Sequence, residues 1–591
     1  MVDTDESVTA ELDQAAHRLE LAVAANPHDG AAHRQHGDAL RRLGRFEQAL
    51  TSYERALTID PDDLEAHNGR GAALRNLMRL DEALASFERA LQICADHAEA
   101  HFNCGVALQF LGRLEEALRR YERALQVAPD LAEAYYNRGI ALQELKRFAA
   151  ALDCYAQAIN VRPAYADAYI NRANLLSQLG RLAEALEDLE RARSLKPNSP
   201  ELHINLGNVL RRLGRCEEAL ETCERAVELR PQSPEAHLNL GAVLYDLNEP
   251  HAAVQSYHRA LLVRPDFAGA HQNRAYAWLL AGDFERGWAG HEWRWKNAND
   301  PLWHERQRFA QPPWLGAEPL AGKRIVIHVE QGFGDTLQFC RYVRWVADLG
   351  ATVVLEVPEL LARLLANLDG VSQLVVRGEP LPAFDLHCPL MSLPLAFGTR
   401  LTTVPARVPY LKSDAAKVSD WKQRLGEHRR PRVGLVWSGG FRPDQPELWS
   451  LNERRNIPLA RLAALRHCEV EFFALQKGPD AQAELAQLLA RGWDGPPIRD
   501  VADELGDFSD TAALMDNLDL IISVDTSTVH LAGALGRPVW LLNRFDTCWR
   551  WLLRRTDSPW YPTLTIYRQE RAGEWDSVVE RVRSDLSRWA A

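Results

Sequence analysis

A repeat of 34 residues constrains the fold of this chain more than any other feature, because it runs from residue 30 to residue 299 without an insertion. Most units open on alanine and histidine, as in Ala32-His33 and Ala66-His67, and carry small residues at fixed positions of two predicted helices. A unit of this length forms one pair of helices, which buries its apolar face only against neighbouring pairs. The sequence therefore predicts an α-solenoid of about eight units over residues 30–299.

These helix pairs resemble tetratricopeptide repeats, in which small residues stand where helices cross. The small residues keep their phase through all the units, and Ala95 replaces one proline of the closing column without a change of period. Residues 1–29 are expected to form a leading helix, since Pro27 stands in the same proline column. The last unit lacks the characteristic repeat residues near Asn299, where the array is expected to end.

Asparagine recurs every 34 residues in the first helix of six units, although asparagine is a poor helix former. A side-chain amide can donate to and accept from a peptide group, whatever side chains that peptide carries. Two interpretations stay open: a hydrogen bond between helix pairs repeated by duplication, or an amide ladder that binds the backbone of an extended peptide. The column comprises Asn103, Asn137, Asn171, Asn205, Asn239 and Asn273.

Histidine forms a second column with the same period. Each of these residues is expected to replace a packing aromatic side chain, and one histidine per repeat is too sparse for a shared metal ion. The column comprises His33, His67, His101, His203, His237 and His271.

A strand, a glycine-bearing loop and a helix follow one another in the C-terminal half of the chain. Arg324–Val329 is a predicted strand, the loop carries Gly332 and Gly334, and Leu337–Leu349 is a predicted amphipathic helix. The two glycines allow backbone to approach a ligand, but the third glycine of a dinucleotide-binding G-x-G-x-x-G motif is missing. Asp335, at the end of this loop, either caps the helix or directs a carboxylate into a cleft.

A second strand–loop–helix unit follows further along the chain. Leu520–Val524 is predicted to be a buried parallel strand, and His530 lies in the first turn of the next helix. A helix N-terminus binds phosphate through free backbone N–H groups, although the same residues cap helices in many proteins. The loop between strand and helix consists of Asp525, Thr526, Ser527 and Thr528.

The two units indicate two facing Rossmann-like halves. Residues 323–420 are assigned to the first half and residues 421–591 to the second, which begins with the predicted strand Arg432–Trp437. Residues 300–322 are rich in tryptophan and proline, so we expect a packed seam between repeats and halves rather than a free linker.

Short motifs recur in a fixed order along this region: Gly334-Asp335-Thr336-Leu337, Val436-Trp437-Ser438-Gly439, Leu475-Gln476-Lys477-Gly478, Asp525-Thr526 with His530-Leu531-Ala532-Gly533, and Trp549-Arg550-Trp551. In that order and spacing they resemble GT-B glycosyltransferases of the heptosyltransferase-like family (family 9) and the related repeat-bearing, O-linked GlcNAc transferase-like enzymes. The resemblance covers roughly residues 320–570. It implies a solenoid followed by an α/β GT-B domain, with the acceptor on the first half and the nucleotide sugar on the second.

The resemblance also implies roles for individual residues. The aspartate that matches Asp335 is taken as the general base of heptosyltransferases, and the leaving phosphate has to be stabilised as well. Asp525 is expected to shape its loop, or to hold His530 or a sugar hydroxyl, and Lys477 has an exposed surface position as its alternative. Related repeat-bearing transferases have an asparagine ladder, which favours the groove interpretation. The candidate phosphate ligands are Lys477, Arg455, Thr526, Ser527, Thr528 and His530.

Two features of other mechanisms are missing from the sequence. Retaining GT-B enzymes often place a Glu-x7-Glu pair in the second half, and Asp525–Leu542 contains none, which favours inversion. No D-x-D cluster ends a predicted strand, and no spacing of histidine and cysteine matches a metal site. We therefore expect no metal and no cofactor, with the nucleotide sugar as co-substrate.

Charge, apolar stretches and cysteine spacing limit which partners and which cellular location we expect. A net charge of −12 disfavours nucleic acid as a partner, and no apolar stretch is long enough to span a membrane. Met1–Gln14 lacks the charged and apolar regions of a signal peptide, and the nine cysteines form no C-x-x-C pair. These features predict a cytoplasmic protein with reduced thiols.

Three functions remain to be separated. The first is a protein glycosyltransferase whose repeats bind the acceptor; flagellin is one candidate, since some repeat-bearing transferases modify it, although no residue here identifies it. The second is a heptosyltransferase-like enzyme that modifies a glycan or lipid. The third is a repeat scaffold with an inactive transferase domain, against which the presence of Asp335, Lys477 and His530 argues.

Overall fold

The computed structural model describes residues 2–297, 305, 308–440 and 449–591, with side chains from residue 10 onward. The chain divides into two compact units, Met1–Asn198 and Ser199–Ala591. This division falls inside the repeat array rather than near residue 300, because the last repeats pack against the α/β region and share its core.

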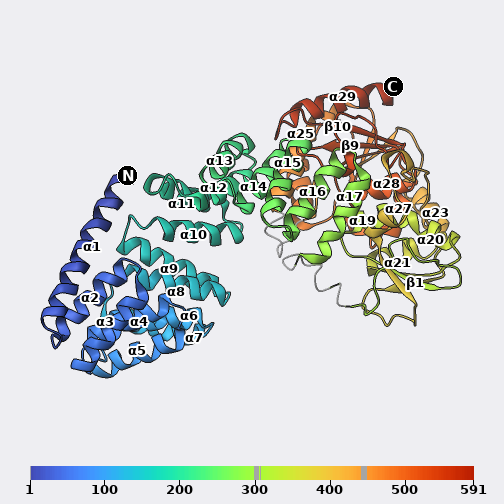
Figure 1. Ribbon diagram of the computed structural model, residues 1–591. Helices are drawn as coiled ribbons and strands as arrows, with labels where there is room; N and C mark the ends of the chain where they lie inside the picture. Colours follow the sequence, from blue (N-terminus) through green and yellow to red (C-terminus); the bar gives the residue numbers. More distant parts are fainter. Residues whose placement is uncertain (1, 298–304, 306–307, 441–448) are drawn as a thin grey trace. The chain divides into compact units, whose positions relative to one another are not determined.

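Unit 1 contains a leading helix followed by five helix pairs (blue to teal in Figure 1). Its helices are α1 (Val2–Ala25), α2 (Gly30–Arg42), α3 (Phe46–Ile59), α4 (Leu64–Asn76), α5 (Leu80–Ile93), α6 (Ala98–Phe110), α7 (Leu114–Val127), α8 (Ala132–Glu144), α9 (Phe148–Val161), α10 (Ala166–Gln178) and α11 (Leu182–Leu195). The predicted α-solenoid is confirmed.

Glycine recurs in the first helices because an aromatic ring of the second helix lies against it. A Cβ atom added at Gly71 would lie 2.5 Å from the Phe87 ring, and one added at Gly105 would lie 2.5 Å from the Tyr121 ring. Both rings are fully buried. The small-residue column therefore marks the crossing of the two helices, where a larger side chain would overpack the core.

The histidine column forms hydrogen bonds that the sequence analysis did not predict. The ring Nε2 of His101 lies 2.9 Å from the carbonyl oxygen of Ala95, and that of His237 lies 2.9 Å from the carbonyl oxygen of Pro231. The expectation that these rings only replace packing aromatics was incomplete, because they also satisfy a carbonyl of the preceding turn. The bond is to the backbone, so Ala95 can stand in the proline column.

Unit 2 opens with three more helix pairs and a short 3-10 helix. These are α12 (Pro200–Arg212), α13 (Cys216–Leu229), α14 (Pro234–Asp246), α15 (Pro250–Val263), α16 (Ala268–Leu280), α17 (Phe284–His291) and η1 (Glu292–Lys296). Trp288 of α17 is fully buried and packs edge-on against Trp549, with ring centroids 5.3 Å apart, and against Phe339 at 6.0 Å. Trp303 of the predicted seam lies outside the described residues.

The first half of the α/β region is a parallel sheet in the order β3-β2-β1-β4. Its strands are β1 (Arg324–His328), β2 (Thr352–Val357), β3 (Gln373–Val376) and β4 (Leu386–Pro389). Its helices include α19 (Phe333–Phe339), η2 (Cys340–Tyr342), α20 (Val343–Asp348), α21 (Glu359–Leu365), η3 (Leu390–Ser392), α22 (Leu393–Ala396) and η4 (Leu401–Thr403). The helix predicted over Leu337–Leu349 begins four residues earlier and is divided by η2.

The second half is a parallel sheet in the order β10-β9-β8-β5-β6-β7. Its strands are β5 (Arg432–Val436), β6 (Glu471–Ala474), β7 (Ile498–Asp500), β8 (Leu520–Val524), β9 (Val539–Asn543) and β10 (Leu564–Arg568). Its helices include α23 (Ala415–Leu425), α24 (Trp449–Arg455), α25 (Leu459–Leu462), η6 (Ala463–His467), α26 (Pro479–Ala490), η7 (Ala502–Glu504), α27 (Phe508–Met515), α28 (Ser527–Ala534), η8 (Trp549–Trp551) and α29 (Asp576–Ala590). The sequence analysis missed the two edge strands, β7 and β10.

The order of the strands explains where a ligand can bind. All strands are parallel, but in each sheet successive strands are added first toward one edge and then toward the other. This switch lies between β1 and β4 in the first half and between β5 and β8 in the second. Ligands of open parallel sheets bind at such points, outside the carboxyl ends of the strands. Both loops singled out from the sequence leave these ends. Among the described helices, none combines the length and the apolar character needed to cross a membrane.

Candidate functional site

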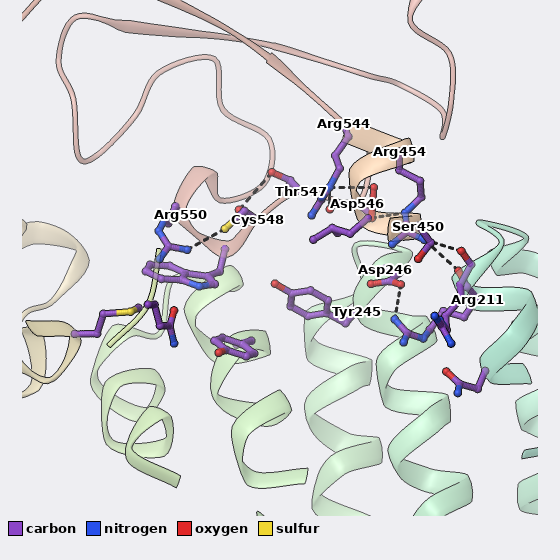
Figure 2. Close-up of a pocket in the computed structure, with 17 residues that line it drawn as sticks. Arg211, Tyr245, Asp246, Ser450, Arg454, Arg544, Asp546, Thr547, Cys548 and Arg550 are labelled. Carbon is purple, nitrogen blue, oxygen red and sulfur yellow. Dashed lines mark hydrogen bonds and ion pairs between the residues drawn. The ribbon is translucent and has the colours of Figure 1, made fainter. Parts of the chain in front are cut away.

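A cavity of about 530 Å³ lies in unit 2 between the last repeats and the carboxyl ends of the strands. Figure 2 shows its repeat side, with Arg211, Tyr245 and Asp246 on α12 and α14, and its α/β side, with Arg454 on α24 and a loop that follows β9. Gln331, after β1, and Met391, after β4, also line it. Both halves of the α/β region and the repeats therefore contribute to one cavity.

Asp335 lies in the first turn of α19, after β1, and its partner Arg550 lines this cavity. Its Oδ2 accepts a hydrogen bond of 3.0 Å from the backbone N–H of Gly332, the residue before α19. The capping interpretation of Asp335 is therefore correct. Its Oδ1 accepts a hydrogen bond from Arg550 Nη2, so the same carboxylate also faces the second half. Capping and a position in the cleft do not exclude each other.

Arg550 lies on η8 and is fixed by several contacts besides Asp335. Its Nε donates to Gln338 Oε1 over 2.7 Å, and its guanidinium lies 4.2 Å from the ring centroid of Trp549. Burial lowers the pKa of Arg550, but Asp335, Cys548 and Asp525 together outweigh burial and raise it above its usual value. The guanidinium is therefore charged and lines the cavity beside Asp335.

Gly334 and His530 meet where the two halves pack together. A Cβ atom added at Gly334 would lie 2.9 Å from the His530 ring, so this glycine permits the close approach of α19 and α28. His530 Nδ1 lies 3.0 Å from the hydroxyl of Tyr561, and its ring stacks on Trp551 at 5.5 Å. Burial, with Arg550 and Arg341 nearby, holds the pKa of His530 well below its usual value. The ring is neutral, so it supplies no positive charge to a phosphate.

The loop after β8 is shorter than predicted, because α28 begins at Ser527 and already includes Thr528. Thr526 is the residue before the helix, and its hydroxyl lies 3.3 Å from that of Ser523. Arg455 Nη1 donates to the backbone oxygen of Asp525 over 3.1 Å. The Arg455 guanidinium also packs directly against Gly439, where a Cβ atom would overlap it unless the guanidinium moved. Arg455 thus joins the loops after β5 and β8, and its phosphate role stays a prediction.

Lys477 lies at the end of β6 and is exposed, and its Nζ contacts the backbone oxygen of Leu505. Neither Lys477 nor the residues of the loop after β8 are among the described residues that line the cavity. The neighbouring Gln476 is buried, and its Oε1 accepts from the backbone N–H of Ser438 over 3.0 Å. This motif therefore ties two strand ends together in the structure.

Arginine is the main charged lining of the cavity, and the sequence analysis named only one of these residues in a motif. Arg454 and Arg544 share Asp546, at 3.1 Å and 3.3 Å, and Arg211 pairs with Asp246 at 2.9 Å. The lining contains five arginines and two aspartates, so it suits an anion: Arg211, Arg212, Arg454, Arg544, Arg550, Asp246 and Asp546.

The repeats hold the loop that carries these arginines. Asn248, in the turn between α14 and α15, has a φ of 62° and donates from Nδ2 to the backbone oxygen of Phe545 over 2.7 Å. Arg454 Nη1 lies 3.3 Å and 3.4 Å from the carbonyl oxygens of Arg211 and Arg212, at the end of α12. A cation at a helix C-terminus is favoured by the helix dipole. The repeats are thus a wall of the cavity and also a support for its loop.

The asparagine column makes contacts between helix pairs. Asn103 is buried, donates to Asn68 Oδ1 over 3.1 Å, and accepts from Arg75 Nη1 over 3.1 Å. Asn171 donates to the hydroxyl of Tyr136 over 2.9 Å, which lies in the preceding unit. These bonds agree with the first interpretation of the column.

The amide oxygens of the column keep the second interpretation open. Asn239 donates from Nδ2 to the backbone oxygen of Ile204, and Asn137 donates to that of Glu133, each over 2.9 Å. In the part of the chain that the structure describes, the Oδ1 atoms of Asn137, Asn171 and Asn239 accept no hydrogen bond. Asn205 and Asn273 are half-buried on α12 and α16.

Profiles of known families match the repeats and a segment of the second α/β half. Sequence profiles described as TPR repeat and tetratricopeptide repeat match residues 37–77, 62–130, 132–165 and three overlapping segments of 170–287. A profile described as glycosyltransferase family 9 (heptosyltransferase) matches residues 457–542. That segment includes β6 to β9 and the loop with Asp525 and His530.

Individual relatives share only low sequence identity with this chain. Protein FlbA of Caulobacter vibrioides is 27% identical over 345 residues, which are 54% of this chain and 55% of FlbA, so the chain spans about half the length of that curated relative. Among solved structures, a chain of the APC/C hetero-tetramer Cut9–Hcn1 is similar over 45% of this chain and 52% of its own length (14% identity, TM-score 0.38). PilF of Pseudomonas aeruginosa is similar over 35% of this chain and 94% of its own length (21% identity, TM-score 0.33).

Proposed function

We propose that this chain, which consists of tetratricopeptide repeats and a glycosyltransferase family 9 domain, transfers a sugar from a nucleotide sugar to a protein acceptor. The observation that carries the proposal is the cavity that the repeats close over the carboxyl ends of both sheets. An acceptor bound to the last repeats, from α12 onward, therefore lies beside the transferase domain. A cytoplasmic location and inversion at the sugar carbon belong to the same proposal.

Asp335 is the proposed base. It stands in the first turn of α19 on the first half and pairs with Arg550, which lines the cavity. In an inverting transfer, one residue accepts the proton of the acceptor while the acceptor atom attacks the sugar carbon from the face opposite the phosphate. A single carboxylate is sufficient for that step.

The leaving phosphate is assigned to the second half. Arg544 and Arg550 follow β9, interact electrostatically with Asp525 and are two of the five arginines that line the cavity. The predicted ligands Thr526, Ser527 and Thr528 stay candidates through the backbone N–H groups at the start of α28. His530 remains a candidate as a neutral hydrogen-bonding group only.

Since arginines rather than a metal ion are assigned to the phosphate, transfer should survive EDTA. The measurement is the initial rate of sugar transfer after dialysis against EDTA, compared with the rate after addition of Mg²⁺ or Mn²⁺. A rate that falls on chelation and returns with either ion would contradict the assignment. A zinc-dependent enzyme assayed in the same buffer shows that chelation was complete.

The asparagine column should bind the acceptor backbone through its amide oxygens. Replacing Asn137, Asn171 and Asn205 together by alanine removes three such groups, and each lost hydrogen bond costs on the order of 1 kcal/mol. Transfer to a protein acceptor should therefore weaken well over tenfold, while slow hydrolysis of the donor persists. The assay compares both rates on the same preparation.

The matched control is Asn160→Ala, which removes an exposed asparagine from α9 outside the column. It should leave both rates unchanged. If the triple variant loses transfer and hydrolysis equally, with its helices intact by circular dichroism, the column has only its role between helix pairs.

A glycan or lipid acceptor is the alternative, and the heptosyltransferase description of the matching profile favours it. An acceptor screen with the purified full-length chain separates the two proposals, because only a protein acceptor should lose transfer in the asparagine variant. Flagellin belongs in that screen. Absence of donor turnover with every nucleotide sugar would leave the repeat scaffold as the remaining function.

A further inference from the structure

Asp335 and Arg550 form an ion pair between the two halves, although 215 residues separate them in the chain. Each oxygen of the carboxylate accepts a hydrogen bond, Oδ2 from the backbone N–H of Gly332 and Oδ1 from Arg550. A general base has to direct an oxygen at the proton that it accepts. In this arrangement the carboxylate is therefore engaged elsewhere.

Arg550 does not depend on Asp335 for its position. Gln338 Oε1 accepts from its Nε over 2.7 Å, Cys548 Sγ lies 3.3 Å from its Nη1, and the Trp549 ring lies beneath its guanidinium. The guanidinium can exchange an anionic partner while these contacts keep it at the cavity. A phosphate group matches the arginine fork and carries more charge than a carboxylate.

We propose that the leaving phosphate of the donor takes Arg550 from Asp335, so that the base becomes free only after the donor has bound. This inference rests on the proposed function. The acceptor proton then moves to Asp335, and the acceptor atom forms a bond to the anomeric carbon of the sugar. The bond from that carbon to the phosphate oxygen breaks, and Arg550 stabilises the electron pair and negative charge left on the phosphate.

The exchange predicts that the two residues act on nucleotide binding in opposite directions. Asp335 competes with the phosphate for Arg550, so Asp335→Asn should tighten nucleotide binding by about threefold to tenfold, as couplings between contacting residues do. Arg550→Gln should weaken it at least about tenfold, because a charge-assisted hydrogen-bonded pair is lost. Arg550→Lys keeps the charge without the fork and should weaken it less.

The experiment is a double-mutant cycle measured by calorimetry on the full chain. The probe is whichever of UDP, GDP, ADP and CMP binds the wild-type protein most tightly. In the Arg550→Gln background, Asp335→Asn should no longer tighten binding. The control is Asp557→Asn, which breaks an arginine–carboxylate pair with Arg555 on the same segment, outside the residues that line the cavity. It should leave the affinity unchanged.

Two results would overturn the inference, and they differ. If Asp335→Asn leaves nucleotide affinity unchanged or lower while Arg550→Gln weakens it, the partner exchange is wrong and the proposed function is unaffected. If none of the four nucleotides binds the wild-type chain, the donor site itself is wrong and the proposed function fails with it. Circular dichroism of each variant excludes loss of fold, and Asn at position 335 retains an oxygen for the Gly332 cap.

Discussion

Replacing Asp335 by asparagine should lower the rate of sugar transfer by about 10²–10⁴-fold, which is the usual contribution of a positioned general base. The amide keeps the size of the carboxylate and an oxygen for the N–H of Gly332, so α19 keeps its cap. It cannot take the acceptor proton. The measurement is the initial rate with saturating donor and acceptor, together with nucleotide affinity, which should not fall.

The matched control is Asp348→Asn, which removes an exposed carboxylate paired with Arg344 in the same half. Its rate should stay near that of the wild type. Near-normal turnover of Asp335→Asn would show that the base is elsewhere. The neighbours on this strand are poor substitutes, because His328 and Glu330 are both buried and engaged, with His387 and Arg294 respectively.

Replacing Arg294 by methionine should destabilise unit 2 by roughly 3–5 kcal/mol, as removal of one partner from a buried ion pair does. Arg294, in η1 after the last repeat, is fully buried and donates to Glu330, two residues after β1, over 3.0 Å and 3.1 Å. It also donates to Ser392 Oγ and Glu292 Oε1, each over 2.8 Å. The midpoint of urea unfolding, followed by tryptophan fluorescence, measures the loss.

The loss should depend on pH in a defined direction. Burial raises the pKa of Glu330 to about 7, although Arg294 lowers it. A carboxyl with a raised folded pKa loses stability as the pH rises from its unfolded value through its folded value. Without Arg294 the folded pKa of Glu330 rises further, so the deficit of the variant should be larger at about pH 8.5 than at about pH 6.

Arg344→Met is the control for stability, because the Arg344–Asp348 pair is exposed and such pairs contribute little. Its midpoint should match that of the wild type at both pH values. A loss below about 1 kcal/mol for Arg294→Met would mean that methionine packs in the same space and that the buried pair adds no net stability.

The candidate site was predictable only in part. Asp335 was found from the glycine-bearing segment after a strand, and the structure pairs it with Arg550, which lines the cavity. His530 was found from its helix, and its neutral ring packs against Gly334. Lys477 was chosen for its charge after a strand; its Nζ contacts the backbone oxygen of Leu505, and its phosphate role stays a prediction. A residue type at a strand end indicates a location, whereas its partner depends on packing.

The sequence alone determined the architecture, because the signals for it are local. The 34-residue period specifies helix pairs through neighbours such as Gly71 and Phe87, and the strand–loop–helix order specifies the parallel sheets. Only the tertiary structure decided which residues meet: Arg550 with Asp335, and Asn248 with the loop after β9. These contacts join residues more than 200 positions apart, and they form only when two sheets and the last repeats pack into one core. Their geometry depends on how the whole unit packs, and no local sequence pattern encodes that packing.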